Sequence, residues 1–353
     1  MNFKSTMKKI HFRLLWEYKK RTKKVFFRNG KYVRWGVIGL GNMADYYSKI
    51  LTIDPKSIIV AVASRDLVKA RSFAHKHKIS RFYGKYEDLV EKEKNNIDFI
   101  YIATPTNTHF EYIELCLKNK YNVLCEKPMV NNLNDLTKLY QIADENNVIL
   151  IEALWTHFLP TINASLEWVK NREVGDINFI RVNFYKKIDY QKTKSAYMTT
   201  DKMGIFNDFA IYALAMLPLI AKNEVTAISK TQIDSSEYGI SDLACQIRIG
   251  NINITIDISS KLAADSNLVI YGTKGYILFA SPFNRTNKVL LFDNGNNLLK
   301  EQIFKYKMDG YEHQINFINN IYLNKDELKY REFVDITRDT ISLLDKIRSV
   351  KND

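Results

Sequence analysis

The strongest chemical signal in the sequence is a run of small residues between an apolar segment and a helical pattern. Gly39 permits a tight turn, Gly41 lets the backbone approach a pyrophosphate, and the small Ala44 allows a helix to pack closely on a strand. The N–H groups at the start of that helix would bind the anion. This G-x-G-x-x-A pattern predicts a dinucleotide site formed by Gly39, Leu40, Gly41, Asn42, Met43 and Ala44.

The residues after the next apolar run bear on which dinucleotide is bound. A site for NAD typically has Asp or Glu here, which accepts a hydrogen bond from the 2′-hydroxyl of the adenosine ribose. This chain instead has Ser64 and Arg65, followed one turn later by Lys69. A hydroxyl, a guanidinium and a further cation favour the 2′-phosphate of NADP. Asp66 and simple solvation of Arg65 support the alternative, so NADP is the preferred cofactor and NAD the second choice.

A third polar run follows an apolar segment, where ligands bind in open α/β sheets. A histidine at the start of a helix, such as His109, is more often a packing residue than a ligand contact. The predicted cofactor contacts in this run are Thr104, Pro105, Asn107 and His109.

A fourth run, Cys125-Glu126-Lys127-Pro128, also follows an apolar segment. Glu126 and Lys127 are predicted to contact the cofactor. Beside an oxidised nicotinamide, the pKa of Lys127 would be lowered, and its amine would hydrogen-bond a reacting hydroxyl or carbonyl. Lys127 is therefore a candidate catalytic residue, with a solvated surface lysine as the alternative.

Alternating strand and helix patterns surround these motifs over residues 33–152. Because strands alternate with helices, we expect a doubly wound α/β domain of Rossmann type, a parallel sheet with helices on both faces. The predicted strands are Val33–Ile38, Ser57–Ala63, Ile97–Ala103, Asn122–Cys125 and Val148–Glu152, and the predicted helices are Asn42–Leu51, Leu67–His77, Phe110–Asn119 and Leu133–Asn146.

Residues 153–353 follow a different pattern, which predicts an α+β domain with an open, mainly antiparallel sheet. Gly272 and Gly275 bound a four-residue turn, which indicates a hairpin. Helices are expected near residues 204–220 and over Arg338–Ser349. The predicted strands are Ile177–Phe184, Leu243–Ile249, Ile252–Ser259, Leu268–Tyr271 and Tyr276–Phe279.

The charge of the chain is concentrated in an N-terminal arm, residues 1–32. The 353 residues are 46% hydrophobic, which excludes a disordered chain, and their net charge is +13. Residues 1–34 hold twelve Lys and Arg and one acidic residue, so the rest of the chain is nearly neutral. Ile10, Leu14 and Tyr18 have the spacing of one helix face. The arm would pack on its own body or a partner subunit, touch an anionic membrane surface or acidic partner, or form a disordered tail; no nucleic-acid motif accompanies it.

Other patterns exclude several classes of protein. Cys116, Cys125 and Cys245 lack a CxxC or paired spacing, so we expect no disulfide framework and a reducing, cytoplasmic setting. The six histidines form no HExxH-like pattern, and no metal site is expected. No segment approaches the ~18 uninterrupted apolar residues of a membrane-spanning helix, and the arm lacks the apolar core of a secretory signal.

In this order and spacing, G-L-G-N-M-A, A-S-R-D, A-T-P-T-N-T-H and C-E-K-P resemble the Gfo/Idh/MocA oxidoreductase family over residues 33–350. The resemblance implies that Lys127 lies beside the nicotinamide and the substrate hydroxyl. It also implies that Asp208 and Tyr212, four residues apart on one helix face, face the substrate. Tyr212 would be the acid/base or a proton relay, and Asp208 would orient it or the substrate. Lys-Met-Gly at 202–204 replaces the glycine run that normally starts this helix.

Residues 152–158, E-A-L-W-T-H-F, resemble the dihydrodiol dehydrogenase-like branch of the family, which usually has Arg in place of His157. Trp155 and His157 are predicted to line the substrate pocket, with a core role for Trp155 as the alternative. The family also implies a homodimer or higher homo-oligomer formed through the open sheet of the second domain.

These features predict an NAD(P)-dependent oxidoreductase. It would transfer a hydride between nicotinamide and a secondary alcohol or ketone of a sugar, a sugar derivative or a cyclic polyol. The main alternative is a non-catalytic dinucleotide-binding regulator or scaffold that acts through its basic arm, but such a protein would not need Lys127, Asp208 and Tyr212. NAD-dependent glycoside hydrolysis is a third alternative, which the expected 2′-phosphate site disfavours.

Overall fold

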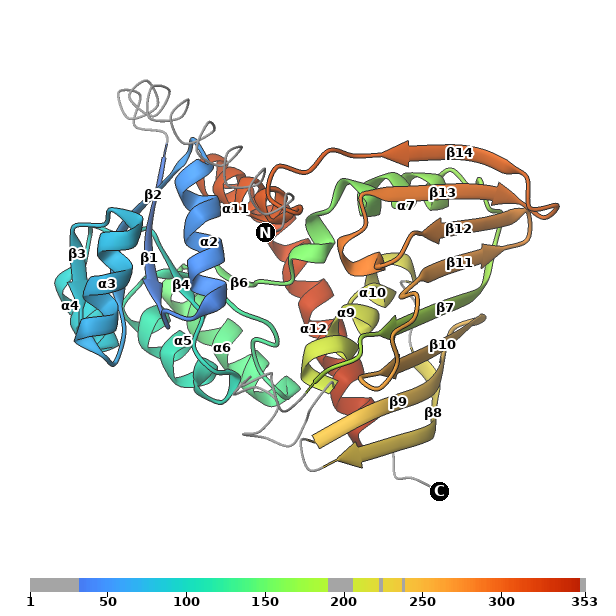
Figure 1. The fold of residues 1–353 in the computed structure, drawn as a ribbon, viewed down its shortest axis with the longest axis horizontal. Coiled ribbons are helices and arrows are strands. Elements are labelled where there is room, and N and C mark those ends of the chain that lie inside the picture. Colours follow the sequence, from blue (N-terminus) through green and yellow to red (C-terminus); the bar gives the residue numbers. More distant parts are fainter. Residues whose placement is uncertain (1–31, 190–205, 222–224, 237–238, 350–353) are drawn as a thin grey trace.

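The computed structural model describes residues 32–189, 206–221, 225–236 and 239–349, which form two sheets and the helices packed on and between them (Figure 1). The predicted helix face of the arm and residues 202–204 lie outside the described residues.

The first sheet is the predicted doubly wound parallel sheet. Its strands lie in the order β3-β2-β1-β4-β5-β6, and every neighbouring pair is parallel. The order reverses between β1 and β4, which is where open α/β sheets bind ligands. The strands are β1 (Val33–Ile38), β2 (Ser57–Ala63), β3 (Arg81–Tyr83), β4 (Phe99–Ile102), β5 (Asn122–Cys125) and β6 (Leu150–Glu152), and the helices are α2 (Asn42–Ile53), α3 (Leu67–His77), α4 (Tyr86–Lys92), α5 (His109–Lys118) and α6 (Leu133–Asn146).

The second sheet confirms the predicted open, mainly antiparallel arrangement. Its order is β14-β13-β12-β11-β7-β10-β9-β8; β7 and β10 pair in parallel and the other described neighbours are antiparallel. The predicted hairpin joins β11 to β12. The strands are β7 (Ile177–Tyr185), β8 (Val225–Ser236), β9 (Gly239–Ile249), β10 (Ile252–Ser259), β11 (Leu268–Gly272), β12 (Gly275–Phe279), β13 (Lys288–Asp293) and β14 (Leu298–Ile303).

The helix expected near residues 204–220 is not continuous in its described part. Phe206–Ala210 forms a π-helical turn, followed by α9 (Ile211–Leu214) and α10 (Leu217–Ile220). Pro218 lies in the first turn of α10, and a proline in a helix interior loses one backbone hydrogen bond and clashes with the preceding turn. The chain therefore begins a new helix there.

Helices from the C-terminal part of the chain pack on both sheets. α11 (Tyr311–Asn324) contacts α2, whereas α12 (Glu327–Ser349) contacts α6 and β6 of the first domain and α9 of the second. Figure 1 shows α12 running between the two sheets. α7 (Pro160–Lys170) packs against β13 and β14. Of these helices, α12 contacts strands of both sheets, β6 of the first and β8 of the second. The described residues include no helix long and apolar enough to cross a membrane.

Candidate active site

The loop between β1 and α2 has the features of a phosphate cradle. Gly39 has a φ of +82°, and a Cβ there would lie 2.6 Å from backbone atoms of Ala103 and Thr104, so only glycine fits. Gly41 has an ordinary φ of −90°, and no atom beyond its neighbours in the chain lies within 4 Å of where its Cβ would be. Neither backbone strain nor protein packing therefore requires glycine at Gly41. The open space in front of it fits a pyrophosphate at the N-terminus of α2.

The end of β2 presents two cations to solvent. Arg65 and Lys69 are exposed, whereas Ser64 is buried and its hydroxyl accepts a hydrogen bond from the Asp66 N–H. The Asp66 carboxylate caps α3, because Oδ1 accepts from Val68 N at 2.8 Å and Lys69 N at 3.1 Å. Capping is a sufficient structural reason for this acid. The presence of Asp66 is thus explained by its capping role and does not require a contact with the ribose.

His109 joins the two polar loops that follow β4 and β5. Its Nδ1 lies 2.9 Å from the Pro128 carbonyl oxygen, and its Nε2 lies 2.9 Å from the Thr104 carbonyl oxygen. The ring is fully buried, and burial lowers the pKa of His109. Thr104 is buried, Pro105 is half-buried and Asn107 is exposed on the same loop. His109 therefore ties these predicted contacts to the Lys127 loop from inside the protein.

Lys127 and Asp208 form the central ion pair of the site. Lys127 Nζ donates to Asp208 Oδ1 at 2.7 Å and to the Asp208 carbonyl oxygen at 3.2 Å. It also lies 5.0 Å from the centre of the Tyr212 ring. The Trp155 Nε1–H donates to the Tyr212 hydroxyl at 3.3 Å. The structure thus brings together Lys127, Asp208, Tyr212 and Trp155 from separate segments of the chain.

The ion pair sets the charge state of both partners. Burial lowers the pKa of Lys127, but the Asp208 carboxylate outweighs it, and the pKa of Lys127 is raised above its ordinary value. Burial raises the pKa of Asp208, but Lys127 outweighs that effect and the pKa is lowered. The expected lowering of the Lys127 pKa is therefore wrong for this structure, because the adjacent Asp208 carboxylate stabilises the charged amine. In the structure Lys127 is a charged donor.

Several residues around this cluster were not predicted. The ring of Tyr311, on α11, stacks on Trp155 with the centroids 4.1 Å apart. The Tyr101 hydroxyl donates at 2.5 Å to Oε1 of Glu126, a predicted cofactor contact that the structure buries, and burial raises the pKa of Glu126. Glu152, at the end of β6, accepts from Met129 N at 2.7 Å. Glu152 opens the E-A-L-W-T-H-F segment, which is the one sequence signal that pointed to it.

His157 is not part of this cluster. The 3₁₀ helix Trp155–Phe158 directs Trp155 toward Tyr212, whereas His157 Nε2 lies 2.9 Å from the Ala215 carbonyl oxygen and its ring lies 6.1 Å from that of Phe333. The two predicted substrate contacts therefore lie in different surroundings. No group of three or more potential metal ligands occurs among the described residues.

The sequence profile of a family described as "Oxidoreductase family, NAD-binding Rossmann fold" matches residues 33–154. Trans-1,2-dihydrobenzene-1,2-diol dehydrogenase of Mus musculus is 31% identical over 253 residues, which is 69% of this chain and 73% of that protein. The Sus scrofa enzyme of the same name is 29% identical over 260 residues, 71% of this chain and 75% of that protein.

Solved structures share the fold at low sequence identity. An inositol dehydrogenase homologue from Azotobacter vinelandii complexed with NAD⁺ matches with a TM-score of 0.80 and 14% identity, over 90% of this chain and 95% of that chain. A 3-ketoreductase from Actinomadura kijaniata in complex with NADP matches with a TM-score of 0.74 and 18% identity, over 90% of this chain and 97% of that chain.

Proposed function

The chain belongs to the Gfo/Idh/MocA family of NAD-binding oxidoreductases, and from this premise we propose that it transfers a hydride between a nicotinamide and a secondary alcohol or ketone of a sugar, a sugar derivative or a cyclic polyol. The observation that carries the proposal is the contact of Lys127 with Asp208 and Tyr212. Lys127 follows β5 of the dinucleotide domain, whereas the other two come from the second domain. The diol and polyol dehydrogenases among its relatives support this substrate class.

The reaction needs a group that holds the substrate oxygen and moves its proton. When bound, the nicotinamide supplies the hydride chemistry. Lys127 is charged, so it would donate a hydrogen bond to the substrate oxygen and, in reduction, give that oxygen a proton. Asp208 keeps Lys127 charged and holds its amine in place. The Tyr212 oxygen accepts from Trp155, which leaves the Tyr212 O–H to donate to the substrate or to relay the proton.

NADP is our proposed cofactor, and NAD the alternative. Arg65 and Lys69 are exposed at the end of β2 and the start of α3, where a 2′-phosphate would reach them. Asp66, the residue that favoured NAD, is engaged in capping α3. The proposed substrates are small sugars or polyols of the kind named for the related dehydrogenases.

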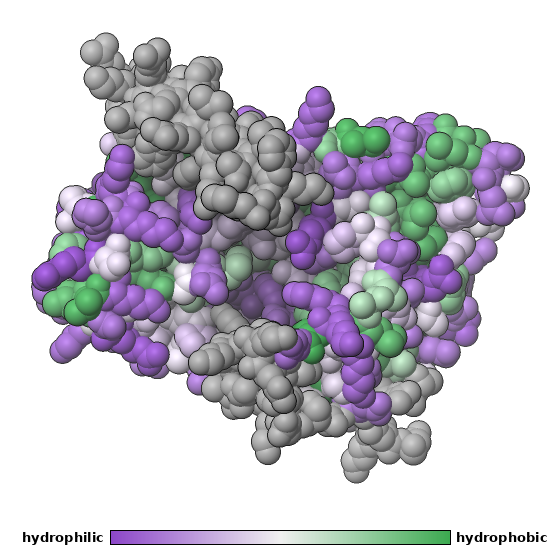
Figure 2. Space-filling view, viewed as in Figure 1, coloured by the Kyte–Doolittle hydropathy of each residue, from purple (hydrophilic) through white to green (hydrophobic). Residues whose placement is uncertain are grey.

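A homodimer or higher homo-oligomer formed through the second sheet is also part of the proposal. Figure 2 shows hydrophobic side chains among hydrophilic ones over the strands of this sheet. At its edge, β14 exposes Leu298, Leu299 and Ile303, each by more than half of its surface. The three cysteines are buried and form no disulfide, which supports a reducing, cytoplasmic setting.

Calorimetric titration of the full chain with NADP⁺, NADPH, NAD⁺ and NADH tests the proposal. We expect tight binding of the phosphorylated pair, after which secondary alcohols and ketones can be screened by nicotinamide absorbance. Tighter binding of the NAD pair would overturn the cofactor assignment alone. Absence of binding by all four would overturn the oxidoreductase function.

A further inference from the structure

Tyr311, at the start of α11, lies against the candidate active site, but the proposed mechanism gives it no role. Its ring stacks on that of Trp155, with the centroids 4.1 Å apart and the planes 16° apart. Trp155 in turn donates its Nε1–H to the Tyr212 hydroxyl. Tyr46 and Tyr47 of α2 contact the Tyr311 ring edge-on, with centroids 5.2 and 6.1 Å away. Tyr311 and Tyr212 therefore contact the face and the edge of the same indole.

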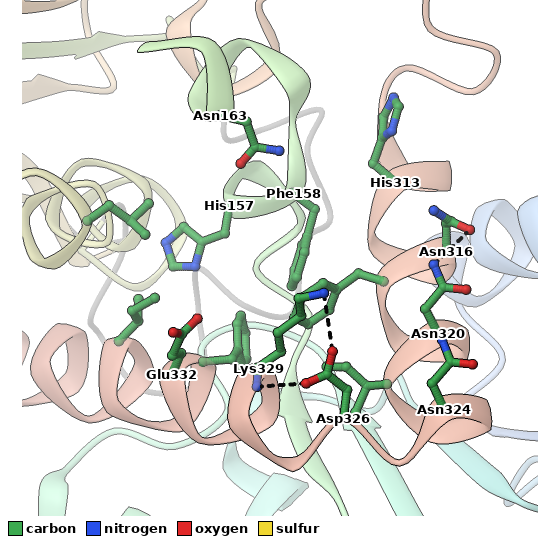
Figure 3. Close-up of a pocket in the computed structure, with 15 residues that line it drawn as sticks. His157, Phe158, Asn163, His313, Asn316, Asn320, Asn324, Asp326, Lys329 and Glu332 are labelled. Atoms are coloured by element: carbon green, nitrogen blue, oxygen red, sulfur yellow. Dashed lines mark hydrogen bonds and ion pairs between the residues drawn. The ribbon is translucent and has the colours of Figure 1, made fainter. Parts of the chain in front are cut away.

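Polar side chains lie on two faces of α11, and Tyr311 is on the face that packs against the first domain. On this face Gln314, three residues further on, accepts from the Tyr47 hydroxyl and donates to the Glu152 carbonyl oxygen at 3.4 Å. The other polar face lines a separate cavity between α11 and α12, to which Tyr311 does not contribute (Figure 3). The polar residues of α11 that line this cavity are His313, Asn316, Asn320 and Asn324.

The Tyr311 hydroxyl is a polar group without a protein partner. It makes no hydrogen bond within the described part of the chain, and it is not one of the fully enclosed polar atoms there that lack a partner. The oxygen therefore keeps exposed surface, in a residue that is half-buried. Burial raises the pKa of Tyr311, and the nearby Tyr212 and Glu126 raise it further, so the phenol is protonated and its oxygen lies on the side of these two residues.

Most of the phenols around Tyr311 have already donated their hydrogen. Three of them donate to protein acceptors, namely Tyr46, Tyr47 and Tyr101. Tyr212 accepts from Trp155 and keeps its own hydrogen. Tyr311 and Tyr212 are therefore the two phenols of this group that can still donate to a ligand.

We propose that Tyr311 is a substrate-binding residue, which hydrogen-bonds a second oxygen of the substrate while Lys127 and Tyr212 hold the reacting oxygen. This assignment rests on the proposed function, because that function places the substrate beside Lys127. A molecule with a single oxygen would cover the Tyr311 hydroxyl without giving it a partner, which is unfavourable. Tyr311 thus selects polyols and sugars over simple alcohols.

Tyr311→Phe tests the proposal, because phenylalanine keeps the ring that stacks on Trp155 and removes only the hydroxyl. The full chain is saturated with NADPH, or with NADH if that binds more tightly, and titrated calorimetrically with myo-inositol, methyl α-D-glucopyranoside or cyclohexanol. The reduced cofactor cannot oxidise these alcohols, so the heat reports binding. We expect Tyr311→Phe to bind both polyols about tenfold more weakly, as expected for one lost hydrogen bond. Its binding of cyclohexanol, which has one oxygen, should equal that of the wild type.

Tyr46→Phe is the matched control, because it removes a neighbouring phenol whose hydrogen goes to Asp309. This variant should bind both polyols as the wild type does. An equal loss in Tyr46→Phe and Tyr311→Phe would mean that the effect comes from packing around the ring, and the proposal would be wrong. Unchanged polyol binding in Tyr311→Phe, or an equal loss for cyclohexanol, would also overturn it.

Two further outcomes separate this proposal from the proposed function. A wild type that binds neither polyol, or a Tyr311→Phe variant that loses affinity for the cofactor instead, would overturn the role of Tyr311. Polyols that bind through Tyr311 but never reduce NADP⁺ or NAD⁺ would contradict the hydride transfer and leave the Tyr311 contact in place.

Discussion

Lys127 and Asp208 lie 81 residues apart in sequence, yet the Lys127 amine, which follows β5, is 2.7 Å from the Asp208 carboxylate in the turn before α9. The Lys127 side chain is 11% exposed and that of Asp208 is 32% exposed. Removing one partner of a largely buried pair leaves an uncompensated charge, so each residue controls the state of the other. The charge on Lys127 therefore depends on a residue from a distant part of the chain.

Lys127→Ala should lower kcat/KM by about 10²-fold or more, the usual scale for loss of a positioned acid/base group. The dissociation constant of the cofactor should change little, because the phosphates and ribose bind elsewhere. Steady-state kinetics and calorimetry measure the two effects. Lys118→Ala, which removes an exposed lysine from α5, is the matched control. Near-normal turnover of Lys127→Ala would remove Lys127 from the mechanism.

Asp208→Asn should change how activity depends on pH. In the wild type the carboxylate raises the pKa of Lys127. Without it, burial dominates and the pKa of Lys127 falls. Since only the protonated amine can give a proton in reduction, the reductive kcat of the variant should fall as pH rises through this lowered pKa, while the wild type stays flat over that range. Superimposable pH profiles would show that Asp208 does not govern Lys127.

The sequence predicted the phosphate loop, five of the six strands of the first sheet and five of the eight of the second, because these depend on local patterns; β8, β13 and β14 were not predicted. The role of Gly39 and Gly41 can be predicted from the few residues around them. A buried strand such as Ser57–Ala63 can be predicted because it is a short apolar run. The three residues of β3 and the seven of α4 are too few to give a periodic signal, so neither was predicted. Local patterns therefore predicted most of the elements that position the site.

The features that the sequence did not predict depend on tertiary contacts. Residues 311–324 are rich in Asn, Ile and Tyr, which are poor or middling helix formers, so α11 and its Tyr311 were not predicted. α12 begins at Glu327 and not at the predicted Arg338. At its true start, the Asp326 carboxylate accepts a hydrogen bond from Lys329 N. The resemblance to a family placed Asp208 and Tyr212 near the substrate, but no spacing rule predicts that the Asp208 carboxylate pairs with Lys127.

Arg65→Ala should weaken NADP⁺ binding by about 10- to 100-fold, the value of one charge-assisted hydrogen bond of about 1.5–3 kcal/mol. Binding of NAD⁺, which lacks the 2′-phosphate, should be unaffected. Arg71→Ala removes the same charge from α3, where the guanidinium lies 5.7 Å from the centre of the Phe82 ring, and is the control. An equal loss of affinity for NADP⁺ and NAD⁺ would mean that Arg65 does not contact the 2′-phosphate.

Glu152→Gln should alter how stability depends on pH. Burial raises the pKa of Glu152 from its ordinary value of 4.5 to about 7, even though the Met129 N–H and Lys127 act to lower it. A carboxyl whose pKa is raised by folding contributes stability that is present below about pH 4.5 and is lost as pH rises through 7. The full loss is about 3 kcal/mol, since one pKa unit corresponds to about 1.4 kcal/mol.

Because the glutamine side chain stays neutral, the Glu152→Gln variant should be more stable than the wild type at pH 8 but not at pH 5; its amide oxygen can still accept from Met129 N. Urea unfolding midpoints at the two pH values measure this difference. Glu145→Gln, which removes the same charge from an exposed position on α6, should leave the pH dependence unchanged. A Glu152→Gln protein that loses stability equally with the wild type between pH 5 and pH 8 would show that Glu152 is ionised throughout that range.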